Sequence, residues 1–140
     1  MVDLEEIKDS FAFFDDWEDK YRFVLDLGKS LPDLPDHKKT EDSIVRGCQS
    51  QVWLLAHFDK SANRLEFEID SDAHIVRGLI AIIQSAYADR SPDAILKYDI
   101  EGLFAELNLF SHLSVARGNG LRAMVHRIRT EAQAYQQLSA

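Results

Sequence analysis

Cysteine is almost absent from this sequence, because its 140 residues include only Cys48. A single thiol excludes an internal disulfide framework, and it excludes a zinc site that needs two or more thiolates from this chain. Proline and glycine are also scarce, with three and six residues, so this is not a low-complexity chain. A free thiol without a disulfide partner is typical of a reducing compartment, and we therefore expect a cytoplasmic protein.

The sequence also has few basic residues and no long hydrophobic run. Lys and Arg number 16 against 24 Asp and Glu, which gives a formal net charge of −8. Because nucleic-acid binding needs clustered Lys and Arg, we expect no nucleic-acid partner. The longest nearly apolar stretch, residues 78–83, is far shorter than the roughly 20 residues of a membrane-spanning helix. Residues 1–6 lack the basic start and apolar run of a secretory signal, so we expect a soluble protein with no membrane partner.

The N-terminal third of the chain has helical periodicity. One apolar face recurs at spacings of three and four residues, formed by Leu4, Ile7, Phe11 and Phe14. A second helix is predicted from Trp17 to about Gly28, where the glycine is a typical stop signal. Residues 31–36 contain two prolines and are predicted to form an extended loop.

The middle of the chain changes to the period of a β-strand. Apolar and polar residues alternate over residues 51–58 and 64–70, and residues 59–63 join these runs as a hairpin loop. Residues 43–45 are predicted to form a third, short strand. Since two strands alone are marginally stable, helices must cover one face of this sheet.

The C-terminal half returns to helical patterns. Ser71 is predicted to cap a helix that extends to about Tyr87, with Asp72 in its first turn. Apolar residues cover more than one face of this helix, which predicts that it is the central one. Ser114 is predicted to cap the last helix. The pattern indicates one α+β domain over residues 1–140, with a small antiparallel sheet of about three strands packed against several helices.

Cys48 is the main candidate for chemistry. Most free cysteines are small buried hydrophobes, but Gly47 precedes this one and three polar residues, 49–51, follow it before the apolar run begins. These neighbours place the thiol on a turn that enters a strand, where a reactive group of a partner can reach it. Thiols react as thiolates, which a nearby cation such as Arg46 favours.

Three functions are compatible with one thiol on a loop. A cysteine-nucleophile hydrolase or acyl-transfer enzyme needs a histidine base, and none of the five histidines has a distinctive spacing to Cys48: His37, His57, His74, His112 and His126. A sulfur carrier needs only the one thiol. A regulatory binding protein would leave Cys48 inert.

A family resemblance favours the carrier. Residues 43–53, Ser-Ile-Val-Arg-Gly-Cys-Gln-Ser-Gln-Val-Trp, resemble the signature of the SufE/CsdE sulfur-acceptor family. Further blocks agree in the same order along nearly the whole chain: Trp17–Tyr21, Leu27–Gly28, Leu31–Pro32, Asp70–Ala73, Ile75–Ala81, His112–Ser114, Arg117 and Gly120–Leu121. One departure is Asp70, where relatives often carry glycine, and it affects the expected local turn.

The resemblance implies an accessory sulfur-transfer protein rather than a stand-alone enzyme. Such a protein accepts persulfide sulfur from a PLP-dependent cysteine desulfurase, SufS-like or CsdA-like, and stimulates that enzyme. It then passes the sulfur to a SufBCD-type scaffold that builds iron–sulfur clusters. We expect no cofactor of its own, because the PLP belongs to the desulfurase and Cys48 carries the persulfide only transiently. We expect a monomer or a weak homodimer.

The resemblance also implies roles for neighbouring residues. Asp72 and Arg117 match positions linked to the partner interface and the surroundings of the reactive thiol, although Asp72 could simply stabilise a helix start and Arg117 could be a surface charge. Gly47 and Gln49 are expected to shape the loop.

A persulfide exposed to cytosolic thiols would be discharged by exchange. We therefore expect the Cys48 sulfur to be buried in the free protein, among apolar neighbours of the sequence such as Val45 and Val52. The loop must then move outward to deliver it, with Gly47 as a residue that permits a hinge.

Overall fold

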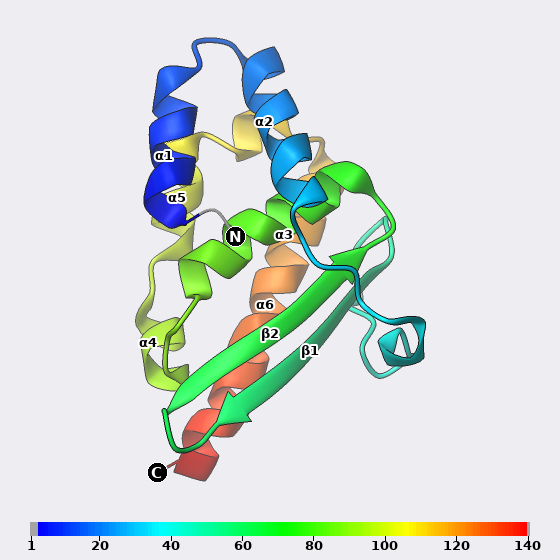
Figure 1. The fold of residues 1–140 in the computed structure, drawn as a ribbon, viewed down its shortest axis with the longest axis vertical. Coiled ribbons are helices and arrows are strands. Elements are labelled where there is room, and N and C mark those ends of the chain that lie inside the picture. The colour runs from blue at the N-terminus through cyan, green and yellow to red at the C-terminus, as the bar shows by residue number, and fades with distance from the viewer. Residues whose placement is uncertain (1–2, 140) are drawn as a thin grey trace.

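The computed structural model describes residues 3–139 and confirms the α+β class (Figure 1). Six α-helices, two short 3₁₀ helices and one hairpin follow in the order α1 (Leu4–Phe13), α2 (Trp17–Lys29), η1 (Asp36–Lys38), β1 (Val52–Asp59), β2 (Arg64–Ser71), α3 (His74–Tyr87), α4 (Pro92–Lys97), α5 (Ile100–Leu107), η2 (Phe110–His112) and α6 (Val115–Ser139). The hairpin lies on one side of α3, and α1 and α2 form an antiparallel pair at the opposite end (Figure 1).

The sheet has two strands rather than about three. β1 and β2 pair in antiparallel register from Val52↔Ser71 to Asp59↔Arg64. The predicted strand at residues 43–45 is reduced to a single bridge, Ile44↔Trp53. The pairing cannot continue because the chain turns away at Gly47, whose φ of 90° is in the left-handed region.

α3 is the central helix, as its all-round apolar pattern predicted. Ten of its fourteen residues are buried. The predicted cap was wrong: the N-cap is Ala73, which has no side-chain hydrogen bond, and Ser71 is the last residue of β2. The Ser71 hydroxyl donates instead to the Gln51 carbonyl at 2.7 Å. Asp72 therefore lies before the helix rather than in its first turn.

α2 ends at Lys29, one residue after the end predicted near Gly28. Gly28 itself has a packing role. It lies at the crossing of α2 and α3, where a Cβ would be 2.8 Å from the Gly78 amide nitrogen. A Cβ on Gly78 would be 2.0 Å from the Val24 carbonyl oxygen. Both glycines therefore permit a close approach of two backbones, and any side chain at either position would separate the helices.

A buried ion pair fixes the end of β2. Asp70 is 2% exposed, and its carboxylate contacts the Arg77 guanidinium and accepts from the Leu34 amide at 2.9 Å. Arg77 also donates to the Leu31 carbonyl at 2.6 Å. Asp70 thus lies within a strand rather than in a turn, and it joins the 31–34 loop to the sheet and to α3.

α6 is the longest helix and runs behind the hairpin (Figure 1). Its predicted cap is confirmed, because Ser114 Oγ accepts from the Arg117 amide at 3.2 Å. Within residues 3–139, no helix combines the length and the apolar character that crossing a membrane requires.

Candidate functional site

The turn that carries Cys48 lies between the Ile44 bridge and the start of β1, as the sequence predicted. Gly47 adopts positive φ, which a residue with a side chain tolerates poorly. A Cβ at Gly47 would also meet Ala123 Cβ of α6 at 3.4 Å. The turn is therefore shaped by glycine and packs directly on α6.

Cys48 lines a cavity of about 270 Å³ between the turn, α3 and α6. The inner wall is apolar and formed by Val52, Val76, Leu79, Leu121 and Met124, whereas the remaining lining includes Gln49, Ser50, Ser114 and Arg117. The side chain of Cys48 is half-buried. Burial raises the pKa of the Cys48 thiol, because the thiolate loses hydration at this position.

One hydrogen bond holds the sulfur. Cys48 Sγ donates to the Gly120 carbonyl oxygen of α6 at 3.5 Å. A Cβ on Gly120 would be 3.6 Å from the same sulfur, which is ordinary van der Waals contact. Only the protonated thiol can donate to a carbonyl, so this contact and the burial both favour the thiol over the thiolate.

The expected apolar surroundings of Cys48 are present, but only some of these residues are its neighbours in sequence. Of the neighbours in sequence, Val52 lines the cavity and Val45 is buried close to the turn. The rest of the apolar wall comes from α3 and α6. Since the sulfur is only half-buried, its surroundings combine an apolar wall with an opening toward solvent.

The loop candidates occupy two different places. Arg117 lines the Cys48 cavity, is exposed, and forms no ion pair with any residue between 3 and 139. Gln49 is exposed and lines the same cavity. Asp72 is not part of the lining; its carboxylate accepts from the Gln51 amide at 3.0 Å, at the base of the Cys48 turn. Asp72 is therefore linked to the thiol through the backbone of residues 48–51.

No histidine lines the Cys48 cavity. His112 stacks on Trp17 with ring centroids 4.4 Å apart, and His57 Nε2 lies 2.8 Å from the Glu68 carboxylate. A cysteine-nucleophile enzyme needs a base within hydrogen-bond reach of the thiol. Among the described residues, none in the cavity lining is a histidine that could act as this base.

The contacts of two residues at the site were not anticipated from the sequence. Gly120 supplies the carbonyl that accepts from the thiol, and the Arg127 guanidinium donates to the Ile44 and Asp42 carbonyls at 3.1 and 2.9 Å. Gly120 belongs to one of the blocks that resemble the family, Gly120–Leu121, but the sequence did not predict its contact with the thiol. Arg127 had no signal.

Comparisons with known proteins found a matching family model and similar sequences. A family model described as "SufE: Fe-S metabolism associated domain" matches residues 5–132. An uncharacterized SufE-like protein of Rhizobium meliloti (strain 1021) is 46% identical over 135 residues, which cover 95% of this chain and 96% of the relative. An uncharacterized SufE-like protein of Rhizobium etli is 48% identical over 135 residues, which cover 95% and 91%.

A solved structure shares the fold. The solution structure of a hypothetical protein from Thermus thermophilus superposes with a TM-score of 0.75 and covers 98% of this chain and 99% of its own. The two sequences are 18% identical, so this likeness concerns the fold alone.

Proposed function

The chain belongs to the SufE family of Fe–S metabolism associated domains, and from that premise we propose that it accepts sulfane sulfur on Cys48 from a PLP-dependent cysteine desulfurase. The desulfurase, SufS-like or CsdA-like, supplies the PLP. The loaded protein then passes its sulfur to a SufBCD-type scaffold. The observation that carries the proposal is the sole cysteine of the chain, half-buried beside a cavity that no histidine lines.

The transfer step follows the chemistry of thiol–disulfide exchange. Cys48 loses its proton to solvent or to a group of the docked partner, and its thiolate attacks the terminal sulfur of the desulfurase persulfide. A new bond forms between Cys48 Sγ and that sulfur, while the sulfur–sulfur bond of the desulfurase breaks and its thiolate leaves with the electron pair. The exchange converts one persulfide and one thiol into one thiol and one persulfide, so no external oxidant or reductant is needed.

In the free protein the thiol of Cys48 is kept protonated, which disfavours this attack. Docking of the desulfurase therefore has to favour the thiolate. Burial and the contact with Gly120 both keep Cys48 protonated. A partner that binds the turn in an outward position would break this contact and expose the sulfur to solvent. The exposed guanidinium of Arg117 is close enough to line the same cavity, and it would stabilise the thiolate and the incoming persulfide anion.

The direct test is mass spectrometry after incubation with a SufS-type desulfurase, PLP and cysteine. Wild-type protein is expected to gain the mass of one sulfur atom, located on the peptide that contains Cys48. Cys48→Ser is expected to gain none and to lose its stimulation of sulfide release, while its circular dichroism spectrum stays unchanged because the loop position carries little of the core.

The outcomes separate the three functions. Stimulation by Cys48→Ser at the wild-type level would contradict the carrier mechanism and indicate a regulatory binding protein. Acylation of Cys48 by activated esters without any sulfur gain would instead indicate a nucleophilic enzyme.

A further inference from the structure

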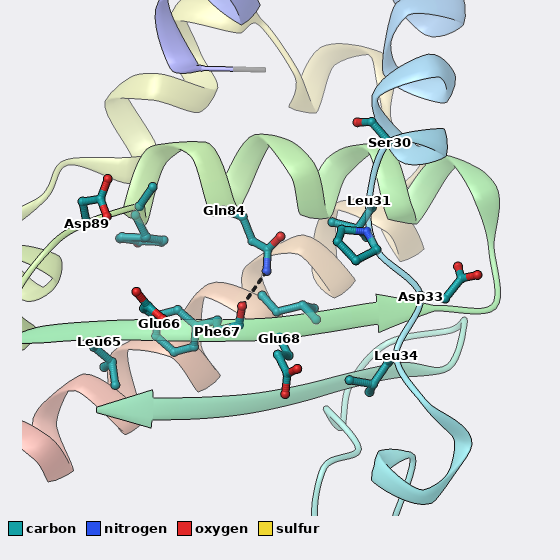
Figure 2. Close-up of a pocket in the computed structure, with 14 residues that line it drawn as sticks. Ser30, Leu31, Asp33, Leu34, Leu65, Glu66, Phe67, Glu68, Gln84 and Asp89 are labelled. Atoms are coloured by element: carbon teal, nitrogen blue, oxygen red, sulfur yellow. Dashed lines mark hydrogen bonds between the residues drawn. The ribbon is translucent and has the colours of Figure 1, made fainter. Parts of the chain in front are cut away.

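A second cavity, of about 440 Å³, lies along the outer edge of β2, between that strand, the 31–34 loop and the C-terminal half of α3 (Figure 2). It shares no lining residue with the Cys48 cavity. A partner can therefore occupy it while the thiol is engaged elsewhere. Its volume is in the range of cavities that bind small molecules or peptide segments.

Backbone polar groups of β2 face this cavity. Backbone N–H and C=O groups of successive residues in an antiparallel strand point to opposite sides. The Ile44 bridge and the register of the hairpin show that the backbone groups of Trp53 point toward β2. In β2, the backbone groups of Leu65, Phe67 and Ile69 therefore point away from β1, to the outer edge. Two contacts agree: the Leu65 amide donates to the Arg90 carbonyl at 3.0 Å, and the Phe67 carbonyl accepts from Gln84 at 2.9 Å. Figure 2 shows the Gln84 side chain reaching from α3 to that carbonyl.

The next groups along the same edge have no partner. Within residues 3–139, no acceptor is present for the Phe67 or Ile69 amide, and the Ile69 carbonyl receives no hydrogen bond. Ile69 is 3% exposed. Buried backbone groups of this kind are normally paired, so the edge has unused capacity to bind another backbone.

The side chains beside this edge indicate what would bind. Glu66 and Glu68 lie on one face of β2, and the apolar residues Leu65, Phe67 and Ile69 lie on the other. The cavity lining contains four carboxylates, of Asp33, Glu66, Glu68 and Asp89. Three of them have cationic partners outside the lining: Asp33 pairs with Arg77, Glu68 with Lys38 and Asp89 with Arg64. Glu66 is exposed and has no ion-pair partner among the described residues.

From this arrangement we propose that the outer edge of β2 binds an extended peptide segment of a partner protein in which basic and apolar residues alternate. Side chains of an added strand alternate between the two faces of the sheet. On the face of Glu66, a Lys or Arg forms an opposite-charge pair across the strands with this unpaired carboxylate. On the other face, an apolar side chain enters the cavity beside Phe67 and Leu34. The segment's backbone satisfies the Ile69 groups and replaces Gln84 at the Phe67 carbonyl.

A second copy of this chain does not fit the same edge. Two β2 edges would bring the unpaired carboxylate of Glu66 toward that of the other copy, and like charges opposite each other destabilise a sheet. The net charge of −8 adds to that repulsion.

The test uses three capped heptapeptides and the intact protein. The probe alternates Lys and Val, beginning and ending with Lys; the first control replaces each Lys by Glu, and the second replaces the central Val by Pro. Hydrogen exchange measured by NMR reports the Phe67 and Ile69 amides one by one. The Lys–Val peptide is expected to slow exchange of both amides about tenfold or more, because each amide gains a hydrogen bond. The two control peptides are expected to protect neither amide.

Paired variants separate a specific site from general attraction to an acidic protein. Glu66→Lys removes a carboxylate beside the edge, and Glu41→Lys makes the same charge change at an exposed residue that does not line the cavity. Glu66→Lys is expected to weaken binding about fivefold or more, and Glu41→Lys less than twofold.

Three results would overturn the proposal. The first is equal weakening by both variants. The second is shifted resonances at Phe67 and Ile69 without slower exchange, which would indicate a small-ligand site. The third is dimerisation of the protein that becomes stronger in Glu66→Lys, which would mean that the edge binds a second copy of this chain. None of these readouts involves sulfur transfer, so the edge site and the carrier function can fail independently.

Discussion

The residues on either side of Cys48 and the turn itself are held in different ways. On the N-terminal side, residues 42–45 form a first stem. Arg127 donates to two of its carbonyls, of Asp42 and Ile44, and the Val45 amide donates to the Val52 carbonyl at 2.8 Å. The buried Ser43 hydroxyl donates to the Lys38 carbonyl at 2.8 Å.

The second stem, residues 50–52, is held by the end of β2. The Gln51 carbonyl accepts from the Ser71 hydroxyl at 2.7 Å and from the Asp72 amide at 3.3 Å. The Gln51 amide donates to the Asp72 carboxylate. Because Ser71 directly follows Asp70, this stem is fixed in turn by the buried pair of Asp70 and Arg77.

The tip, residues 46–49, has one hydrogen bond among the described residues, from Cys48 Sγ to the Gly120 carbonyl. Three of its four residues are exposed. Several hydrogen bonds fix the stems, whereas the tip is held by one weak sulfur donor and by its packing on α6, so the tip can move while the stems stay in place. The difference indicates that access to the sulfur depends on the tip alone, and that variants of the stems act on it indirectly.

The largest effect is expected from the base of the second stem. Asp70→Ala removes the buried carboxylate that pairs with the Arg77 guanidinium, and the Arg77 side chain is only 12% exposed. Removing one partner of a buried ion pair is expected to lower the free energy of unfolding by about 3–5 kcal/mol. Urea denaturation measures this value. Asp33→Ala is the matched control, because Asp33 pairs with the same Arg77 but is 90% exposed, and its loss is expected to cost less than about 1 kcal/mol. Equal losses for the two variants would show that the buried pair does not anchor the stem.

The next effect is expected from the first stem. Arg127→Met keeps the aliphatic contact but removes both donors to the stem carbonyls, which is expected to lower the free energy of unfolding by about 1–3 kcal/mol. Alkylation of Cys48 in the folded protein is expected to become faster, because the stem then moves with the tip. Arg122→Met is the control on the same helix: Arg122 lies over the Phe110 ring at 3.9 Å and does not contact the stem. If both variants alkylate at the wild-type rate, Arg127 does not restrain the loop.

The sequence predicted the parts of this arrangement that depend on local pattern. The hairpin, the central position of α3 and the Ser114 cap follow from periodicity and from capping chemistry within a few residues. The turn at Cys48 followed from Gly47 and the polar residues after it. The start of α3 was misplaced because Ser71 bonds to Gln51 across the sheet rather than capping the helix, and such a partner is not visible in a local pattern.

The contacts that hold the thiol were beyond sequence reasoning because they join distant segments. Gly120 is 72 residues from Cys48, and Arg127 is 83 residues from Ile44. Neither residue type carries a signal for such a pairing. The crossing of Gly28 and Gly78 was missed for the same reason, since a glycine near the end of a helical pattern is also a common stop signal.

A smaller effect is expected at the tip itself. Because burial raises the pKa of Cys48, its alkylation by iodoacetamide at neutral pH is expected to be about tenfold slower in the folded protein than in urea. The pH at half-maximal rate is expected to be higher for the folded protein. The unfolded chain then loses its thiol proton first, so the free energy of unfolding falls as pH rises through the interval between the two pKa values. Equal rates and equal midpoints would show that the tip leaves the sulfur freely accessible.

The smallest effect on stability is expected at Asp72, where the stem and the exposed surface meet. Asp72→Ala removes the acceptor of the Gln51 amide, and because the site is exposed the free energy of unfolding is expected to fall by less than about 1 kcal/mol. The second stem is then held only through the Gln51 carbonyl, so alkylation of Cys48 is expected to accelerate about two- to fivefold, the size of one modest hydrogen bond.

Asp72→Asn separates the hydrogen bond from the charge, because its amide oxygen can still accept from Gln51. This variant is expected to alkylate at the wild-type rate. If the Asp72 charge also guides docking, Asp72→Asn changes the affinity for the desulfurase, measured by calorimetry, without any change in alkylation. Faster alkylation in Asp72→Asn to the level of Asp72→Ala would mean that charge, rather than the contact with Gln51, holds the second stem and through it the tip.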